Sequence, residues 1–270
     1  GGYNSYAENL FVRQITPSIQ FRFRQNNDFR SNKKHWLSIR HVNIQRDRDD
    51  SNILTTTEPN YSVFNIRYVN SNDNLINYKK WYTDFQAGQD FSKVSFNYEY
   101  RRLFESNRQI NIRAFAGAFL KNKTDINSNY FSFALDRPTD YLFDYNYLGR
   151  SEASGIFSQQ YITAEGGFKS KLETPFANQW ITTINMSTTL WKYVLAYGDM
   201  GLVKNKFDSA HFVYDSGVRI NLVTDYFEIY LPIYSNLGWE IGQPNYDQKI
   251  RFKFTADPQV LLGLFRRRWF

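Results

Sequence analysis

The sequence of 270 residues contains no cysteine and only three histidines. Without cysteine there are no disulfides and no thiolate metal sites. The histidines at 35, 41 and 211 are scattered, and no His-Glu-x-x-His spacing occurs. The sequence also lacks a glycine-rich phosphate-binding loop and a Gly-x-Ser-x-Gly nucleophile motif. We therefore expect no metal, no cofactor and no catalytic residue in this chain.

The sequence also lacks the ~18 consecutive apolar residues that a transmembrane helix needs. Its longest apolar stretch runs only from Val260 to Phe265. Yet 24 Phe, 20 Tyr and 6 Trp together make 19% of the chain, although its mean hydropathy is that of a polar protein. A transmembrane β-barrel needs both kinds of residue, because its outer surface meets lipid and its interior is polar. The composition therefore favours an outer-membrane β-barrel.

Apolar and polar residues alternate with a period of two residues, which indicates half-buried β-strands rather than helices. We expect strands near residues 14–25, 34–46, 60–70, 78–89, 92–104, 108–121, 129–136, 141–149, 157–169, 179–191, 193–204, 211–223, 225–236 and 248–256. The predicted fold is all-β, a transmembrane antiparallel up-and-down β-barrel of about 14 strands, with both termini on the periplasmic side. If residues 136–140 belong to a folded-in loop, the barrel has about 12 or 13 strands.

The alternation assigns one face of each strand to lipid and the other face to the lumen. The predicted lipid-facing band includes Val94, Phe96, Ile112, Ala116, Ile220, Ile229 and Phe252. An arginine at Ile229 should therefore impair membrane insertion more than an arginine at Tyr230, which lies on the opposite face.

Charged residues concentrate on the predicted lumenal face. They are Arg22, Arg24, Arg67, Asp84, Glu99, Arg101, Arg113, Glu165, Lys169, Asp199, Asp215, Arg219, Glu228, Arg251 and Lys253. Isolated buried ions are unfavourable, so we expect these charges to pair with one another across a filled lumen. Basic residues outnumber acidic residues in this set, and any residual leak should therefore favour anions.

Residues 1–256 form the predicted barrel, and residues 257–270 form a separate C-terminal element. Pro258 cannot continue a β-ladder and suits the first turn of a helix. One helical face would carry four apolar residues ahead of a basic run, namely Val260, Leu261, Leu264 and Phe265 before 266–268. We expect a short amphipathic helix at the periplasmic membrane interface. The alternative is a closing strand that ends at Phe270.

Two further features bear on partners and modification. The triplet Asp208-Ser209-Ala210, in a predicted loop, resembles the O-glycosylation sequence of the Bacteroidota, which makes Ser209 a candidate acceptor; the alternative is an ordinary polar loop. The net charge is +7, but no basic run is flanked by stacking aromatics on one face, so we expect no nucleic-acid partner.

Two segments carry a resemblance to a known family. The first is Arg137-Pro-Thr-Asp-Tyr-Leu-Phe-Asp-Tyr-Asn-Tyr-Leu-Gly-Arg-Ser-Glu152 with Phe157-Ser-Gln-Gln160, and the second comprises Lys249-Ile-Arg-Phe-Lys-Phe254 and Leu264-Phe-Arg-Arg-Arg-Trp-Phe270. Together they resemble the C-terminal region of large Bacteroidota proteins of the M1-type (gluzincin) metallopeptidase-like family. The resemblance implies a β-barrel, the outer membrane and a Bacteroidota source. The family's zinc motif lies in an upstream domain, so no catalytic residue carries over.

These features predict a non-catalytic barrel in the cell outer membrane that anchors or docks a larger, peptidase-like protein or assembly. Its expected partners are outer-membrane lipids, lipopolysaccharide and other outer-membrane complex subunits. One alternative is a narrow channel for small solutes or ions. A second alternative is a barrel subunit of an outer-membrane secretion or insertion complex.

Overall fold

The computed structural model describes residues 2–7, 10–23, 31–48, 61–123, 131–134, 167–174, 176–223 and 227–254. Their regular structure is β-strand, apart from one 3-10 turn at Tyr246–Lys249. In this part of the chain no helix is long and apolar enough to cross a membrane. The predicted all-β class is confirmed.

One antiparallel sheet holds 14 strands, and its main path joins 12 of them in an up-and-down order. The strands are β1 (Gly2–Ala7), β2 (Leu10–Ile15), β3 (Ser18–Phe23), β4 (Lys33–Arg48), β5 (Tyr61–Asp73), β6 (Asn77–Gly88), β7 (Phe91–Leu103), β8 (Gln109–Asn122), β11 (Trp180–Trp191), β12 (Val194–Lys204), β13 (Ala210–Val223), β14 (Phe227–Ser235), β15 (Gly238–Trp239) and β16 (Arg251–Phe254). Strands β2 and β3 pair with successive parts of β4, and Thr16–Pro17 interrupts them because proline cannot donate to the ladder.

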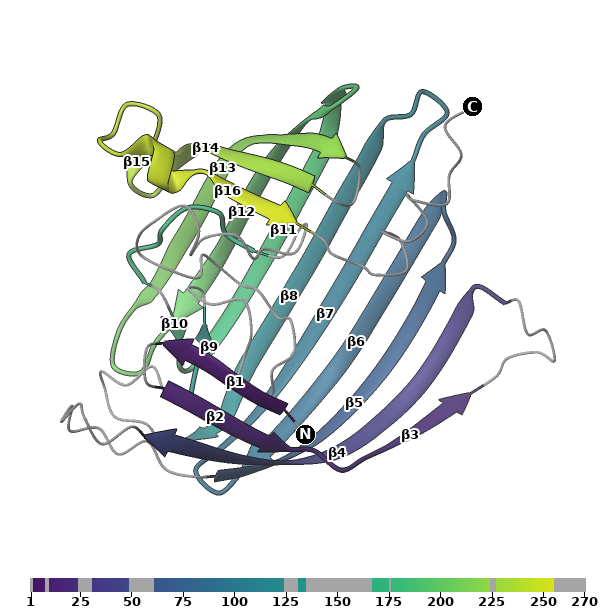
Figure 1. Ribbon diagram of the computed structural model, residues 1–270, viewed down its shortest axis with the longest axis vertical. Helices are drawn as coiled ribbons and strands as arrows, with labels where there is room; N and C mark the ends of the chain where they lie inside the picture. Colours follow the sequence, from purple (N-terminus) through teal and green to yellow (C-terminus); the bar gives the residue numbers. More distant parts are fainter. Residues whose placement is uncertain are drawn as a thin grey trace.

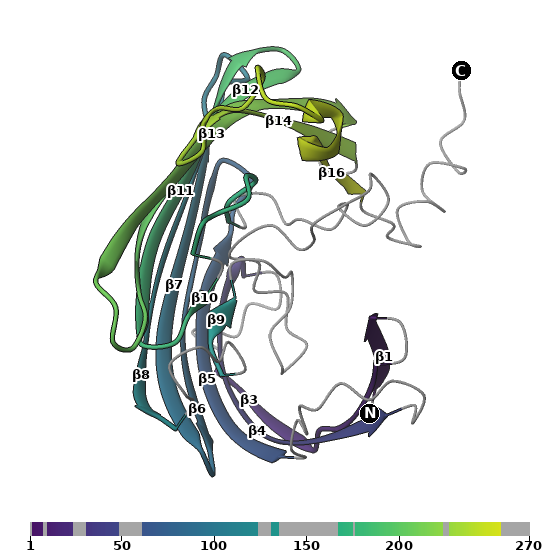
Figure 2. The same ribbon diagram turned by 90° about the vertical axis from the view of Figure 1, so that its left-hand side faces the viewer.

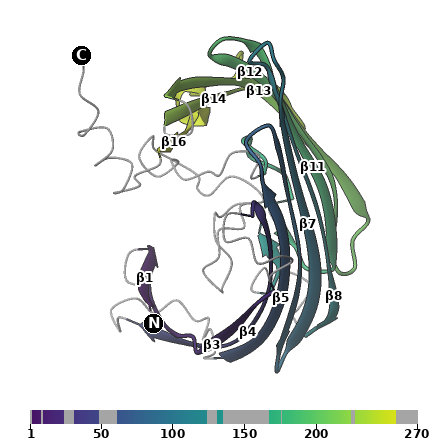
Figure 3. The same cartoon turned by 90° about the vertical axis from the view of Figure 1, so that its right-hand side faces the viewer.

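The sheet curls strongly but is not closed. Figure 1 shows the long strands side by side, and Figures 2 and 3 show the curve from its two sides, with β1 and β16 near its opposite edges. No pairing among the described strands joins β1 to β14, β15 or β16. The structure therefore shows an open antiparallel sheet where the alternation pattern predicts a closed barrel.

Of the residues predicted as strands between 129 and 169, the structure describes 131–134 and 167–169, and these do not form part of the main sheet. Strand β8 pairs directly with β11 from Trp180↔Ala118 to Thr188↔Ile110, which leaves no place between them. Within 131–134, the described part of the predicted strand 129–136, the structure has the short β9 (Phe133–Ala134), which pairs with β10 (Phe176–Ala177) in a separate two-stranded sheet. Residues 167–169 are not in a strand. The predicted strand 141–149, residues 157–166 of the predicted strand 157–169, and the predicted C-terminal helix in 257–270 lie outside the described residues.

The two faces of the sheet have opposite chemistry. Along β7, Lys93 and Asn97 are buried, whereas Val94 and Phe96 are 39% and 40% exposed. Strand β9 lies inside the curve in Figure 2, and its Phe133 packs edge-on against Phe115 of β8, with ring centroids 5.8 Å apart. Phe115 and the polar residues of β8 share a face, so the concave face is the polar, buried one.

The convex face is the apolar, exposed one. Its exposed large residues include Phe64, Phe85, Val94, Phe96, Ile184, Met186, Met200, Leu202 and Phe212. Among the predicted lipid-facing residues Ala116 is also exposed, and Ile112, Ile220, Ile229 and Phe252 are half-buried. Soluble proteins bury the apolar face of a sheet and expose the polar one. This sheet does the reverse.

Candidate functional site

The concave face carries the densest set of polar contacts and is the candidate site. On β5 and β6 the contacts centre on Asp84, which is buried. Arg67 Nε lies 2.6 Å from Asp84 Oδ2, and Asn65 Nδ2 donates to the same oxygen at 3.0 Å. Gln86 Nε2 donates to Asp84 Oδ1 at 2.6 Å. Both carboxylate oxygens are therefore satisfied, as a buried anion requires.

A second set joins β6, β7 and β8. Arg113 Nε donates to Asn97 Oδ1 at 2.6 Å, and Asn97 Nδ2 donates to Glu99 Oε1 at 2.9 Å. Tyr78 donates to Glu99 Oε2 at 3.3 Å, and the Arg101 guanidinium lies 5.3 Å from the centroid of the Tyr78 ring. In this network the side-chain amide of Asn97 bridges Arg113 and Glu99.

The third set joins an inner segment, defined as residues 131–134 and 167–174, to the strands of the 14-stranded sheet, which we call the wall. Lys169 Nζ donates to Asp199 Oδ2 at 2.8 Å, and both side chains are at most 2% exposed. The backbone amides of Lys169 and Ser170 donate to Asp215 Oδ2 at 2.5 and 2.7 Å. Asn185 Nδ2 donates to Asp199 Oδ1 at 2.8 Å. A cation and two amides from the inner segment thus meet two wall carboxylates.

Strands β13 and β14 carry a further buried ion pair. Arg219 Nη2 lies 2.5 Å from Glu228 Oε1, with the two side chains 4% and 0% exposed. Tyr230 donates to Glu228 Oε2 at 2.8 Å, and its ring packs edge-on against Tyr197. Arg251 on β16 is fully buried and donates to the carbonyl of Gln248 at 3.0 Å. Buried polar contacts therefore continue to β16, near the edge of the sheet.

Apolar side chains of the inner segment cover one end of the concave face, the end where β4 stops and β5 begins. Phe131 packs in a cluster with Val42, Ile44, Val63 and Phe91. The other cluster joins Phe133, Phe168 and Leu172 of the inner segment to Phe115, Ala177, Ile181, Val203 and Val213. The rings of the inner segment thus cover an apolar part of the concave face, and its Lys169 and Ser170 reach the polar part.

A glycine on the concave face makes room for one of these rings. A Cβ at Gly117 would lie 2.5 Å from Phe133 Cζ, and contacts that short between carbons are strongly repulsive. The absence of a side chain at Gly117 therefore allows Phe133 to pack against β8. A Cβ at Gly201 would instead lie 2.7 Å from the Thr182 carbonyl oxygen of the neighbouring strand.

Asparagines fix the inner segment at the same end of the sheet. Asn122 Nδ2 donates at 2.9 Å to the carbonyls of Phe131 and of Asn178. Asn205 Oδ1 accepts from the Asn178 amide at 2.8 Å, and Asn178 Oδ1 accepts from the Lys206 amide at 2.7 Å. Amide side chains can donate and accept at once, which lets three of them satisfy irregular backbone without a strand ladder.

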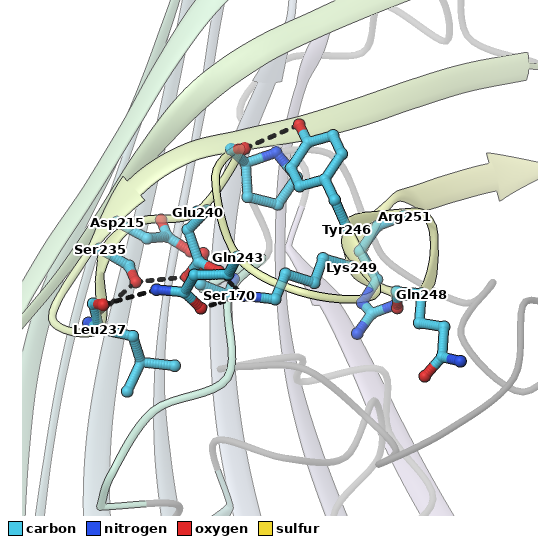
Figure 4. A network of polar contacts seen from close by, with 11 residues as sticks. Ser170, Asp215, Ser235, Leu237, Glu240, Gln243, Tyr246, Gln248, Lys249 and Arg251 are labelled. Carbon is cyan, nitrogen blue, oxygen red and sulfur yellow. Dashed lines mark hydrogen bonds and ion pairs between the residues drawn. The ribbon is translucent and has the colours of Figure 1, made fainter.

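The segment after β14 folds back over the edge of the sheet. Figure 4 shows Glu240, Gln243 and Lys249 converging beside Ser235. Ser235 and Lys249 both donate to Glu240, and Lys249 also donates to Gln243. Tyr246 donates to the Pro232 carbonyl at 2.8 Å. Desolvation and the nearby Glu240 raise the pKa of the Tyr246 hydroxyl, so it stays a donor.

Several predicted site residues need correction or lie outside the described part. Arg22 shares the concave face through its pairing with Trp36 but is exposed near the sheet edge. Lys169 is on the inner segment and not on a wall strand. Arg24 and Glu165 lie outside the described residues, and Lys253 is described only as part of β16.

The candidate acceptor Ser209 lies in the turn between β12 and β13 and is exposed. Its amide donates to Asp208 Oδ1 at 2.7 Å, and His211 Nε2 lies 2.9 Å from Asp208 Oδ2. These hydrogen bonds lower the pKa of the Asp208 carboxyl. The turn is accessible, and its modification stays a prediction.

Within the described residues, no group of three or more His, Cys, Asp and Glu side chains could hold a metal ion. His35 contacts Tyr68 and Asn70, and His211 contacts Asp208. These contacts are those of structural side chains.

The alternation of apolar and polar residues does not distinguish the inner segment from a strand of the main sheet. The strand-like alternation of this segment matches that of the wall, and Phe131, Phe133 and Phe168 were assigned to wall strands for that reason. The inward-facing glycine Gly117 was the available signal, because a glycine inside a strand often marks a place where another chain segment approaches closely.

Comparison with known proteins does not assign this chain to a family. No protein-family model matches this chain, and no curated protein resembles it.

Proposed function

We propose that this chain is the wall of an outer-membrane β-barrel whose convex face contacts lipid. The observation that supports this is the inverted sheet, in which Val94, Phe96 and Met200 are exposed while Lys93, Asn97 and Asp199 are buried. Such a sheet is unfavourable in water, because large apolar patches on soluble monomers are rare. In lipid it is favourable, since the apolar band then meets hydrocarbon.

The proposed role is anchoring, with no catalysis by this chain. Its concave face is occupied by ion pairs and by the inner segment, whose rings fill two apolar clusters. This arrangement suits a plugged, rigid support better than an open channel. The resemblance to the C-terminal region of M1-type metallopeptidase-like proteins suggests a peptidase-like protein or assembly as what the barrel holds at the outer membrane.

Refolding tests the membrane proposal. The purified chain, denatured in urea, is diluted into lipid vesicles and floated on a density gradient under alkaline carbonate. We expect it to float with the vesicles and to migrate on gels differently before and after heating, as folded barrels do. A monodisperse, folded chain in buffer without lipid or detergent would contradict the proposal.

A second assay tests the non-catalytic role. The chain and the full-length gene product, if it is longer, are compared for bound zinc and for peptide hydrolysis. We expect no stoichiometric zinc and no turnover in residues 1–270. Zinc with turnover in this chain alone would overturn the anchoring role, while leaving its membrane location intact.

A further inference from the structure

A groove of about 710 Å³ lies between the β5–β6 turn and the β7–β8 turn. Ile76, Leu103 and Phe104 give it an apolar wall, and Arg102 and Glu105 bring charge to it. All five residues are exposed. The groove therefore combines an apolar surface with a cation, which is the chemistry of a site for an amphiphile.

Two exposed cations stand together on the convex face beside this groove. In the register of β6 and β7, Arg102 is opposite Asn77 and Lys79 is opposite Tyr100, so the two cations are diagonal neighbours. Diagonal neighbours on one sheet face are about 7–8 Å apart, within the span of one phosphate group and two long side chains. The Arg102 guanidinium lies 5.1 Å from the Phe104 ring centroid, and Lys79 Nζ lies 5.8 Å from that of Tyr100.

Neither cation has an acidic partner within the part of the chain that the structure describes. On the concave face, by contrast, Lys169, Arg67 and Arg219 each pair with a carboxylate. The convex cations are therefore available to an external anion.

The position of the groove along the strands is also informative. Tyr68 and Trp81 have ring centroids 5.3 Å apart, and those of Trp81 and Phe96 are 6.2 Å apart. Moving along the convex face toward the groove, the apolar band gives way to these rings and then to cations. Aromatic rings followed by basic residues mark the level of lipid headgroups in membrane proteins.

We propose that this groove binds an anionic membrane lipid through its headgroup phosphate. Arg102 and Lys79 contact the phosphate, because charge-assisted hydrogen bonds to phosphate are among the strongest in proteins. Ile76, Leu103 and Phe104 hold the start of an acyl chain. The inference rests on the proposed function, since the groove meets lipid only if the convex face lies in a membrane. The carboxylate of Glu105, which also lines the groove, repels the phosphate and lowers the affinity of the site for the lipid.

The test is native mass spectrometry of the refolded 270-residue chain in detergent, titrated with dioleoyl phosphatidic acid and, separately, with phosphatidylcholine. We expect a preference for phosphatidic acid. The double variant Arg102→Gln, Lys79→Gln should weaken its binding by about tenfold. The matched control Lys121→Gln removes an exposed lysine at the opposite end of the sheet and should change binding by less than about twofold. The independent variant Glu105→Gln should tighten binding.

Three outcomes would overturn the site. They are no preference for phosphatidic acid, an equal loss in the Lys121→Gln control, and displacement of the lipid by millimolar inorganic phosphate, which would indicate a site for free phosphate. Flotation of the same variants with phosphatidylcholine vesicles separates the two proposals. If the chain and its variants float normally but the lipid-binding test fails, only the proposed lipid site is wrong. If the unaltered chain does not float, the proposed membrane location is wrong as well.

Discussion

Asp199 on β12 and Asp215 on β13 lie directly opposite each other, and each is 2% exposed. Like charges in such cross-strand pairs repel. The inner segment offsets this repulsion, since Lys169 donates to Asp199 and the amides of Lys169 and Ser170 donate to Asp215. The wall and the inner segment therefore depend on each other at this point.

Replacing Lys169 with methionine should destabilise the folded protein by about 3–5 kcal/mol, because it leaves a buried carboxylate without its cation. Lys171→Met is the matched control, since Lys171 is exposed two residues further along the same segment. Urea unfolding of the protein in vesicles, followed by tryptophan fluorescence, measures both. Equal losses in the two variants would show that the Lys169–Asp199 pair does not stabilise the wall.

Gly117→Ala should displace the inner segment, because the new Cβ would lie 2.5 Å from Phe133 Cζ. Overpacking of this kind costs about 1–3 kcal/mol. Gly198→Ala is the control, since a Cβ there meets nothing within 4 Å. In a double-mutant cycle, Phe133→Ala should relieve part of the cost of Gly117→Ala, with a coupling of at least about 1 kcal/mol. If the two stability losses are strictly additive, Phe133 does not pack against Gly117.

Phe96→Arg should impair folding into vesicles by about 2–4 kcal/mol, the cost of a cation in the middle of a lipid-facing band. Ser106→Arg, in the exposed β7–β8 turn, is the control and should fold normally. The folded fraction is read from gel mobility before and after heating. Normal folding of Phe96→Arg would contradict the proposal that the convex face contacts lipid.

The structure changes one expectation from the sequence, that an arginine at Ile229 impairs membrane insertion more than an arginine at Tyr230. Ile229 is half-buried on the convex face, as predicted, but Tyr230 is only 1% exposed. Its ring lies 5.7 Å from Lys169 Nζ and 5.6 Å from the Arg219 guanidinium. An arginine there would add a third buried cation, so Tyr230→Arg should no longer be the milder change.

Planar-bilayer recording should show no stable conductance of porin size, because the inner segment and the ion pairs occupy the concave face. Any small leak should favour anions, since basic residues outnumber acidic ones on that face. A large, stable and cation-selective conductance would instead favour the channel hypothesis.

The alternation of the sequence predicted the faces of the long strands well, because side chains on successive residues point to opposite sides whether or not a sheet closes. Lys93 and Val94 on β7 illustrate this. The same rule could not place Phe133 or Phe168, because a segment that packs against the concave face shows the same alternation as one within it. The alternation also could not predict whether the sheet closes into a barrel, because pairing between the first and last strands is a long-range property.

The central claim is that the convex face contacts lipid, and one labelling measurement tests it most directly. Because the chain has no cysteine, Phe96→Cys and Ser95→Cys each provide a single labelling site on opposite faces of β7. Each variant is labelled with bimane and folded into vesicles that contain brominated lipid. Contact of the convex face with lipid predicts strong quenching at residue 96 and little at residue 95. Equal quenching, or stronger quenching at residue 95, would contradict it.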